Sequence, residues 1–342
     1  MNKEINLLVH GPFSGNAYEE ILLSLRNSVF KTFINKIVFS IYKDDEEKTK
    51  QFILSYSKEK DFNIEFVMSE DVFNPGFFNI NRQINLVSRG LAKIEKNSFV
   101  IKLRNDQWID FDKFSGVVKE VEGMRKLITT NCFTRKDRLY YPSDMFLAGN
   151  HELLELYYRA PFFARTHTDI EKTLGNSGYS LYEFEKNFLP PEAYLFREYL
   201  KSNNWEIKNT FADSERSLKC FFYLVNSWNI GLRWKKQRNP RLSPGSIILP
   251  YTFSVSPFPG APVEHARCYS EGDFTGKKTI TDQVYLLFAR LLFLVRPPFR
   301  RRAFFLLRQK IHNLPSNSLR RKIFFSSKTS LIRNFAIKIL LK

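Results

Sequence analysis

Residues 98–108, with the sequence SFVIKLRNDQW, decide the fold. Residues 99–103 favour a strand, and the run then stops at Arg104, Asn105 and Asp106. A short apolar run that ends in polar residues is typical of a buried strand whose end delivers polar groups to a sheet edge. Ligands of open α/β sheets bind at the carboxyl edge. We therefore expect Arg104 and Asp106 either at a ligand site, as anion donor and hard oxygen ligand, or in a solvated turn with a local ion pair.

Strands and helices alternate on the N-terminal side of this stretch. Apolar runs at 5–9, 36–40 and 64–67 predict strands. Residues 79–94 predict the strongest helix, since their apolar positions repeat with helical spacing at Ile80, Ile84, Val87, Leu91 and Ile94. The alternation predicts an α/β fold with a mostly parallel sheet flanked by helices.

The turn after the first strand carries Gly11 and Pro12 and precedes a predicted helix. A strand, glycine turn and helix in succession can place backbone N–H groups against a phosphate or a nucleoside. The turn lacks the Gly-Lys-Ser/Thr of a P-loop and a complete Gly-x-Gly-x-x-Gly, so by itself it does not specify a phosphate site.

Two carboxylates on the C-terminal side are candidates for chemistry. Residues 126–130 predict a further strand, and Pro-Ser-Asp at 142–144 interrupts the next one, which places Asp144 in a turn beside buried residues. Glu192 follows two prolines at the start of a predicted helix, where the helix dipole alone favours an acid. Residues 218–228 are apolar on nearly every side and predict a buried helix.

The positive charge of the chain belongs to its C-terminal part. The 342 residues carry 53 Lys and Arg against 35 Asp and Glu, a net charge of +18. Residues 283–342 contain 14 of these basic residues and no acid, which leaves only +4 for residues 1–282. We therefore predict a catalytic domain over 1–282 and a separate basic helical segment over 283–342. A uniformly basic nucleic-acid-binding domain would distribute its charge differently.

The basic segment mixes long apolar runs with arginines and contains a Pro-Pro break at 297–298. Such a segment suits a helix that lies in a membrane interface and contacts anionic headgroups. The alternatives are ordinary helices packed on the domain with a solvated basic face, and nucleic-acid binding, which the long aliphatic runs disfavour.

The chain gives no sign of export or of a membrane span. Its three cysteines are scattered, with no C-x-x-C spacing, which argues against a disulfide framework or a zinc site and fits a reducing compartment. We expect no signal peptide and no spanning helix, because the N-terminus enters a strand at once and no window of about 20 apolar residues exists. The expected location is the cytoplasm, peripheral on the cytosolic face of the membrane.

Six short motifs in order resemble the WavE lipopolysaccharide-synthesis family over about residues 5–200. They are GP at 11–12, IVFS at 37–40 leading to KDD at 43–45, NRQI at 81–84 with GLA at 90–92, IKLRND at 101–106, YPSDMF at 141–146 and PEAY at 191–194. The resemblance implies a GT-A-like fold and a glycosyltransferase that uses a nucleotide sugar.

The resemblance also implies roles for single residues. The nucleoside would face Gly11, Asp44 and Asp45, and the nucleotide or sugar would be lined by Arg82 and Gln83. The segment with Lys102, Arg104 and Asp106 would occupy the place of the Asp-x-Asp motif that carries a metal-bound diphosphate. Arg104 stands where that motif has its first acid. Two alternatives follow: Asp106 ligates Mn²⁺ or Mg²⁺, or Arg104 itself neutralises the diphosphate.

The implied reaction adds a sugar to a glycan or glycolipid acceptor such as lipopolysaccharide core or capsule. An inverting transfer needs a carboxylate base, for which we favour Asp144 over Glu192. The alternatives are a sugar-phosphate or nucleotidyl transferase on a similar sheet, and a non-enzymatic basic protein that binds membrane or nucleic acid.

Overall fold

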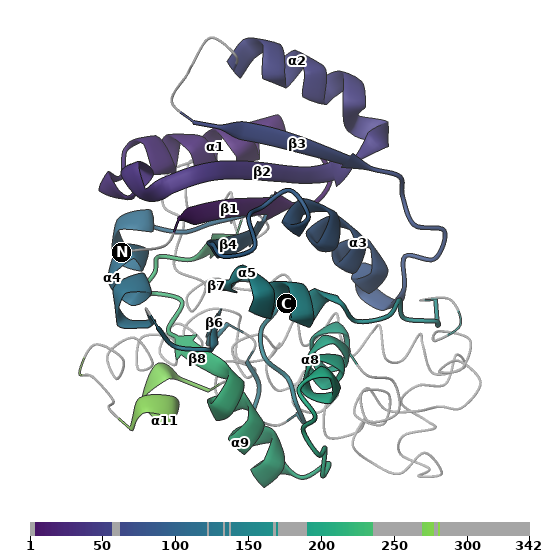
Figure 1. Ribbon diagram of the computed structural model, residues 1–342, viewed down its shortest axis with the longest axis vertical. Helices are drawn as coiled ribbons and strands as arrows, with labels where there is room; N and C mark the ends of the chain where they lie inside the picture. The colour runs from purple at the N-terminus through teal and green to yellow at the C-terminus, as the bar shows by residue number, and fades with distance from the viewer. Residues whose placement is uncertain are drawn as a thin grey trace, which may run out of the picture.

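A seven-stranded mixed sheet forms the centre of the protein (Figure 1). The computed structural model describes residues 4–56, 62–121, 123–132, 134–136, 138–166, 169, 190–234, 269–276 and 280. The strand order is β3-β2-β1-β4-β7-β6-β8. The strands are β1 (Ile5–His10), β2 (Ile34–Tyr42), β3 (Ile64–Ser69), β4 (Phe99–Arg104), β6 (Leu127–Thr130), β7 (Leu147–Asn150) and β8 (Phe222–Val225).

Most neighbouring strands are parallel, as the sequence predicts. The parallel pairs are β1 with β2, β2 with β3, β1 with β4, and β6 with β8. Strand β7 is antiparallel to both of its neighbours, β4 and β6. A second, two-stranded sheet joins β5 (Gln107–Trp108) to β9 (Arg233–Trp234). The α/β class and the flanked, mostly parallel sheet are confirmed.

Helices cover both faces of the sheet (Figure 1). The core on one face includes Leu7 and Val9 of β1 and is closed by α1 (Gly15–Arg26), α2 (Glu46–Tyr56) and α4 (Phe111–Val121). The core on the other face includes Leu8 of β1 and is closed by α3 (Ile80–Leu91), α5 (His151–Tyr158), α8 (Pro191–Ser202) and α9 (Phe211–Phe221). Successive side chains of a strand point to opposite faces, so every second residue of β1 counted from Leu8 lies on the same face as Leu8, and the others lie on the opposite face.

Helix α3 is the helix that the spacing of its isoleucines and leucines predicts. Ile80, Ile84, Val87 and Leu91 are all buried in the core of its face. Its close approach to the sheet requires Gly90, because a Cβ atom there would overlap the side chain of Leu8 on β1. The helix therefore lies directly over the central strands.

The predicted helix at 218–228 is wrong. Helix α9 ends at Phe221, and residues 222–225 form the edge strand β8, which pairs in parallel with β6. An apolar run with no clear period fits a buried strand as well as a buried helix. Here residues 222–225 form a strand because they pair with the edge of β6.

The basic segment 283–342 and residue Cys268 lie outside the described residues, so the predicted domain division and the membrane-surface segment stay predictions. Of the helices within the described ranges, none has both the length and the apolarity needed to cross a bilayer. Cys132 is buried, with its Sγ 3.9 Å from the sulfur of Met145, and Cys220 is exposed.

Candidate functional site

The carboxyl edge of the sheet gathers polar side chains at its centre. Strand β1 lies between β2 and β4, so the chain connections leave it in opposite directions, which makes the edge between β1 and β4 a topological switch point. His10, the last residue of β1, lies in register with Arg104, the last residue of β4. Because β7 runs antiparallel, its start lies at this same edge, with Leu147 opposite Lys102 and Asp144 three residues earlier in the chain.

Lys102 is a buried cation on the face covered by α3 and α5. Its side chain has no exposed surface, and its Nζ donates a hydrogen bond of 2.5 Å to the carbonyl oxygen of Asp144. Burial lowers the pKa of Lys102 to about 7, and the negative charge of Asp144 acts in the opposite sense. Nζ also lies 5.7 Å from the ring centroid of Tyr158. With this pKa the amine is about half protonated at neutral pH, and an anion bound at this edge would favour its charged form.

Arg104 and Asp106 form a paired unit at the end of β4. Nε and Nη2 of Arg104 donate to the two carboxylate oxygens of Asp106, each at 3.1 Å. The Arg104 side chain is one-third exposed, so it reaches the surface of the edge. The predicted local ion pair is present. The residues also lie at the switch point, where a ligand site stays a prediction.

The donors around Asp106 do not fit a divalent metal ion. Mg²⁺ and Mn²⁺ need several oxygen ligands, whereas the carboxylate of Asp106 faces the guanidinium group of Arg104, whose positive charge repels a second cation. Within the described ranges no cluster of three His, Cys, Asp or Glu side chains is placed to hold a metal. The cations Lys102 and Arg104 occupy this part of the edge instead.

Asp144 and Glu192 lie close enough to interact, although 48 positions separate them. Asp144 is 8% exposed in the turn before β7, and Glu192 is half-buried in the first turn of α8. Burial, and after it the negative charge of Asp144, raise the pKa of Glu192 to about 8, while a hydrogen bond from Tyr141 and the positive charge of Arg138 oppose that shift. At neutral pH the pair therefore holds a proton on Glu192.

Two tyrosines at the end of α5 complete the cluster. Burial, with the charge of Asp144 among the further causes, raises the pKa values of both Tyr157 and Tyr158 well above their usual range. The hydroxyl of Tyr158 accepts a hydrogen bond of 3.2 Å from Nε2 of Gln83 on α3. The Tyr157 hydroxyl is buried without a hydrogen-bond partner in the described part of the chain. Gln83 is thus connected to Lys102 through Tyr158.

Sequence reasoning missed His10 as a site residue. It is 5% exposed, and its Nε2 atom has no hydrogen-bond partner among the described residues. Burial, followed by the positive charges of Lys102 and Arg104, lowers its pKa well below the usual range. The available signal was a polar residue at the end of an apolar strand and before a glycine turn, the same pattern that identified Arg104.

The glycine turn after β1 packs against β4. Gly11 has φ +138°, a conformation that favours glycine, and a Cβ there would overlap the side chain of Asn105. The amide nitrogen of Asn105 donates to the carbonyl of Pro12, and the carboxylate of Asp45 accepts from the backbone N–H of Phe13 at 2.8 Å. Asp45 therefore fixes this turn.

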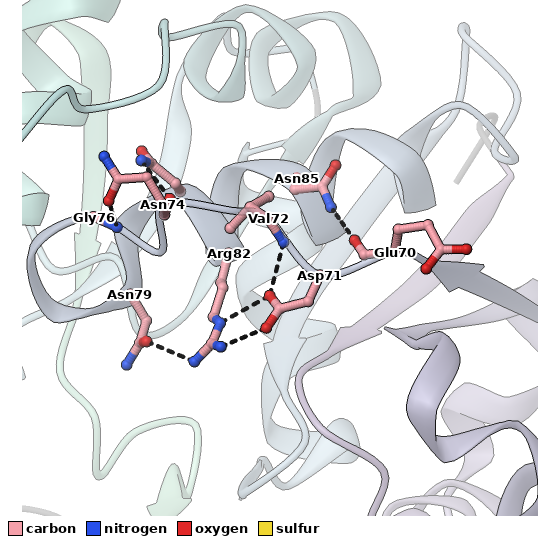
Figure 2. Close-up of polar contacts among 9 residues, drawn as sticks. Glu70, Asp71, Val72, Asn74, Gly76, Asn79, Arg82 and Asn85 are labelled. Carbon is pink, nitrogen blue, oxygen red and sulfur yellow. Dashed lines mark hydrogen bonds and ion pairs between the residues drawn. The ribbon is translucent and has the colours of Figure 1, made fainter. Parts of the chain in front are cut away.

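Arg82 lies at the β2–β3 side of the same edge (Figure 2). It forms a two-point ion pair with Asp71, just after β3, with nitrogen–oxygen distances of 2.9 and 2.5 Å. Its Nη1 donates to the side-chain oxygen of Asn79 at 3.1 Å, and its guanidinium carbon lies 5.8 Å from the ring centroid of Tyr42. The pair lowers the pKa of Asp71 and raises that of Arg82.

The structure thus connects six of the ten residues named from sequence through hydrogen bonds or electrostatic contacts at one edge, namely Gln83, Lys102, Arg104, Asp106, Asp144 and Glu192. Gly11 borders them through Asn105. Arg82 and Asp45 make separate contacts, and Asp44 is exposed.

The sequence matches no protein-family model and no curated protein sequence. The structure is similar to 4-diphosphocytidyl-2C-methyl-D-erythritol synthase from Anaerococcus prevotii, with TM-score 0.36 and 14% identity over 66% of this chain and 87% of that one. It is also similar to S. aureus TarS (TM-score 0.32, 16% identity, 45% of this chain and 29% of that one) and to the WbbM bifunctional glycosyltransferase (TM-score 0.33, 8% identity, 46% and 34%). These are loose similarities, and they assign no substrate and no residue role.

Proposed function

We propose that this protein is a glycosyltransferase that moves a sugar from a nucleotide-sugar donor to a glycan or glycolipid acceptor. The observation that carries the proposal is that two interacting carboxyl groups, Asp144 and Glu192, lie beside two cations, Lys102 and Arg104, at the switch point of the sheet. The resemblance of the sequence motifs to the WavE family supports an acceptor such as lipopolysaccharide core or capsule.

Asp144 acts as the base in this proposal. Its carboxylate takes the proton of an acceptor hydroxyl, and the acceptor oxygen forms a bond to the anomeric carbon of the donor sugar. The bond from that carbon to the diphosphate oxygen breaks, and its electron pair leaves with the nucleoside diphosphate. Lys102 and Arg104 stabilise the negative charge that develops on this leaving group.

Glu192 serves as the protonated partner of Asp144. With a pKa of about 8, it carries a proton at neutral pH and donates a hydrogen bond rather than competing as a second anion. This arrangement leaves the role of the base to Asp144.

The nucleoside is assigned to the β2–β3 side of the edge. Arg82 sits there over Tyr42, with Asp71 fixing the direction of its guanidinium group. A flat cation beside an aromatic ring can stack on a base or ribose. The Gly11 turn follows β1, the neighbour of β2 on the side away from β3.

Residues 283–342 are proposed to hold the enzyme on an anionic membrane surface from the cytosolic side. Their 14 basic residues and lack of acids support that role. A membrane location would bring the enzyme to a lipid-linked acceptor, and no role in nucleic-acid binding is proposed.

The test is donor hydrolysis by the purified protein across a panel of UDP-, GDP-, CMP- and dTDP-sugars. We expect one donor to be cleaved slowly to the free sugar and the nucleoside diphosphate, or the monophosphate for a CMP-sugar. The Asp144→Asn variant should lose this activity, whereas Glu198→Gln, a surface carboxylate on the same helix as Glu192, should retain it. Release of a sugar phosphate would instead indicate a sugar-phosphate or nucleotidyl transferase. No cleavage of any donor would count against both enzyme readings.

A further inference from the structure

We propose that His10, Lys102 and Arg104 form a metal-independent site for the diphosphate of the donor. The inference rests on the proposed function for the identity of the ligand. It goes beyond that function by adding His10 to the diphosphate site and by excluding a required divalent ion.

The three residues share one face of two neighbouring strands. His10 of β1 lies opposite Arg104 of β4, and Lys102 precedes Arg104 by two positions, so all three side chains leave the sheet on the same side. That side is the one covered by α3 and α5, because Leu8 of β1 packs into its core. Burial, followed by the positive charges of Lys102 and Arg104, lowers the pKa of His10, which agrees with this arrangement.

Two of these groups have hydrogen-bonding capacity that an anion would use. Nε2 of His10 is buried without a partner in the described ranges, and a buried polar atom in that state is destabilising unless a ligand or water satisfies it. Nζ of Lys102 contacts the Asp144 carbonyl with one N–H and has at least one further N–H to donate. Phosphate oxygens are acceptors of the kind that both groups need.

Asp106 has a different role from that of a metal ligand. It accepts from two guanidinium nitrogens of Arg104 and so fixes the orientation of this cation. A positioned Arg supplies the positive charge and the directed donors that a metal ion would otherwise supply to a diphosphate. Asp106 is then a positioning residue whose own negative charge weakens anion binding.

For Asp106, a metal-independent site predicts the opposite result from a metal site. We would titrate the full-length protein with inorganic pyrophosphate by calorimetry, once in excess EDTA and once with Mn²⁺. Binding is expected in EDTA. Arg104→Gln and His10→Leu should each weaken it by about tenfold or more, the loss expected for one hydrogen bond to a charged group. Asp106→Asn should bind pyrophosphate as tightly as the unaltered protein or more tightly.

The matched control is Lys113→Met, which removes an exposed lysine paired with Asp110 on the opposite face of the sheet and should leave binding unchanged. Circular dichroism and thermal unfolding of each variant separate loss of the site from loss of the fold. Binding that requires Mn²⁺ and disappears in Asp106→Asn would overturn the inference, as would an absence of binding in both conditions. Cleavage of a donor sugar only with Mn²⁺ would support the proposed function and contradict this site. Pyrophosphate binding in EDTA without cleavage of any donor would support this site and contradict the proposed function.

Discussion

Replacing Lys102 with methionine tests the buried cation at the centre of the site. The side chain has no exposed surface, and burial lowers its pKa from 10.5 to about 7. At a pH between these two pKa values, Lys102 is protonated in the unfolded chain and deprotonated in the folded chain. The free energy of unfolding therefore rises with pH across this window. A methionine of similar length binds no proton, so this part of the pH dependence should vanish in Lys102→Met.

The expected size follows from the pKa difference. Each pH unit inside the window changes the free energy of unfolding by about 1.4 kcal/mol. From about pH 7.5 to about pH 9.5, the stability of the unaltered protein relative to Lys102→Met should therefore rise by about 3 kcal/mol. Other groups titrate equally in both proteins and cancel in the difference.

The assay is urea unfolding at several pH values across this range, with linear extrapolation to water. Lys113→Met serves as the control, because it makes the same replacement at an exposed lysine on the opposite face of the sheet. A constant difference for Lys102→Met would show that Lys102 keeps its proton in the fold, and the argument from burial would then be refuted.

Three further predictions concern Glu192, Asp71 and Asn81. Glu192→Gln should keep most of the activity at pH 7, because the amide resembles the protonated acid. In the unaltered protein the rate at saturating donor should fall above pH 8, when Glu192 ionises beside Asp144, and the variant should lose this fall. A pH–rate profile of both proteins measures this, and a variant that is inactive at pH 7 would make Glu192 the base. Asp71→Asn should lower the free energy of unfolding by no more than about 1 kcal/mol, since its ion pair with Arg82 is partly exposed. It should nevertheless weaken nucleotide binding severalfold. Equal affinity of the two proteins in a nucleotide titration would show that this pair is not part of the site. Asn81→Ala should cost about 2–4 kcal/mol in urea unfolding, because the buried amide bonds the backbone of both Asn74 and Phe163, and a loss below about 1 kcal/mol would contradict that role.

The sequence by itself determined the elements and the places where they end. The alternation of apolar runs and amphipathic segments identified β1 to β4 and α3, because local periodicity follows directly from burial on one or two faces. The same patterns located Arg104 and Asp106 at the end of a strand. Sequence order could not separate strand from helix at 222–225, where every position is apolar or aromatic and only the partner strand decides.

The tertiary structure alone decided which of the candidate residues meet. Strand β7 enters the sheet antiparallel, and this reversal brings Asp144 to the edge where β4 ends. Helix α8 then adds Glu192, and the register of β1 with β4 adds His10. Strand direction and register depend on contacts between segments far apart in the chain, and no local pattern encodes them. The pKa values that give these groups their chemistry arise from that same burial and proximity.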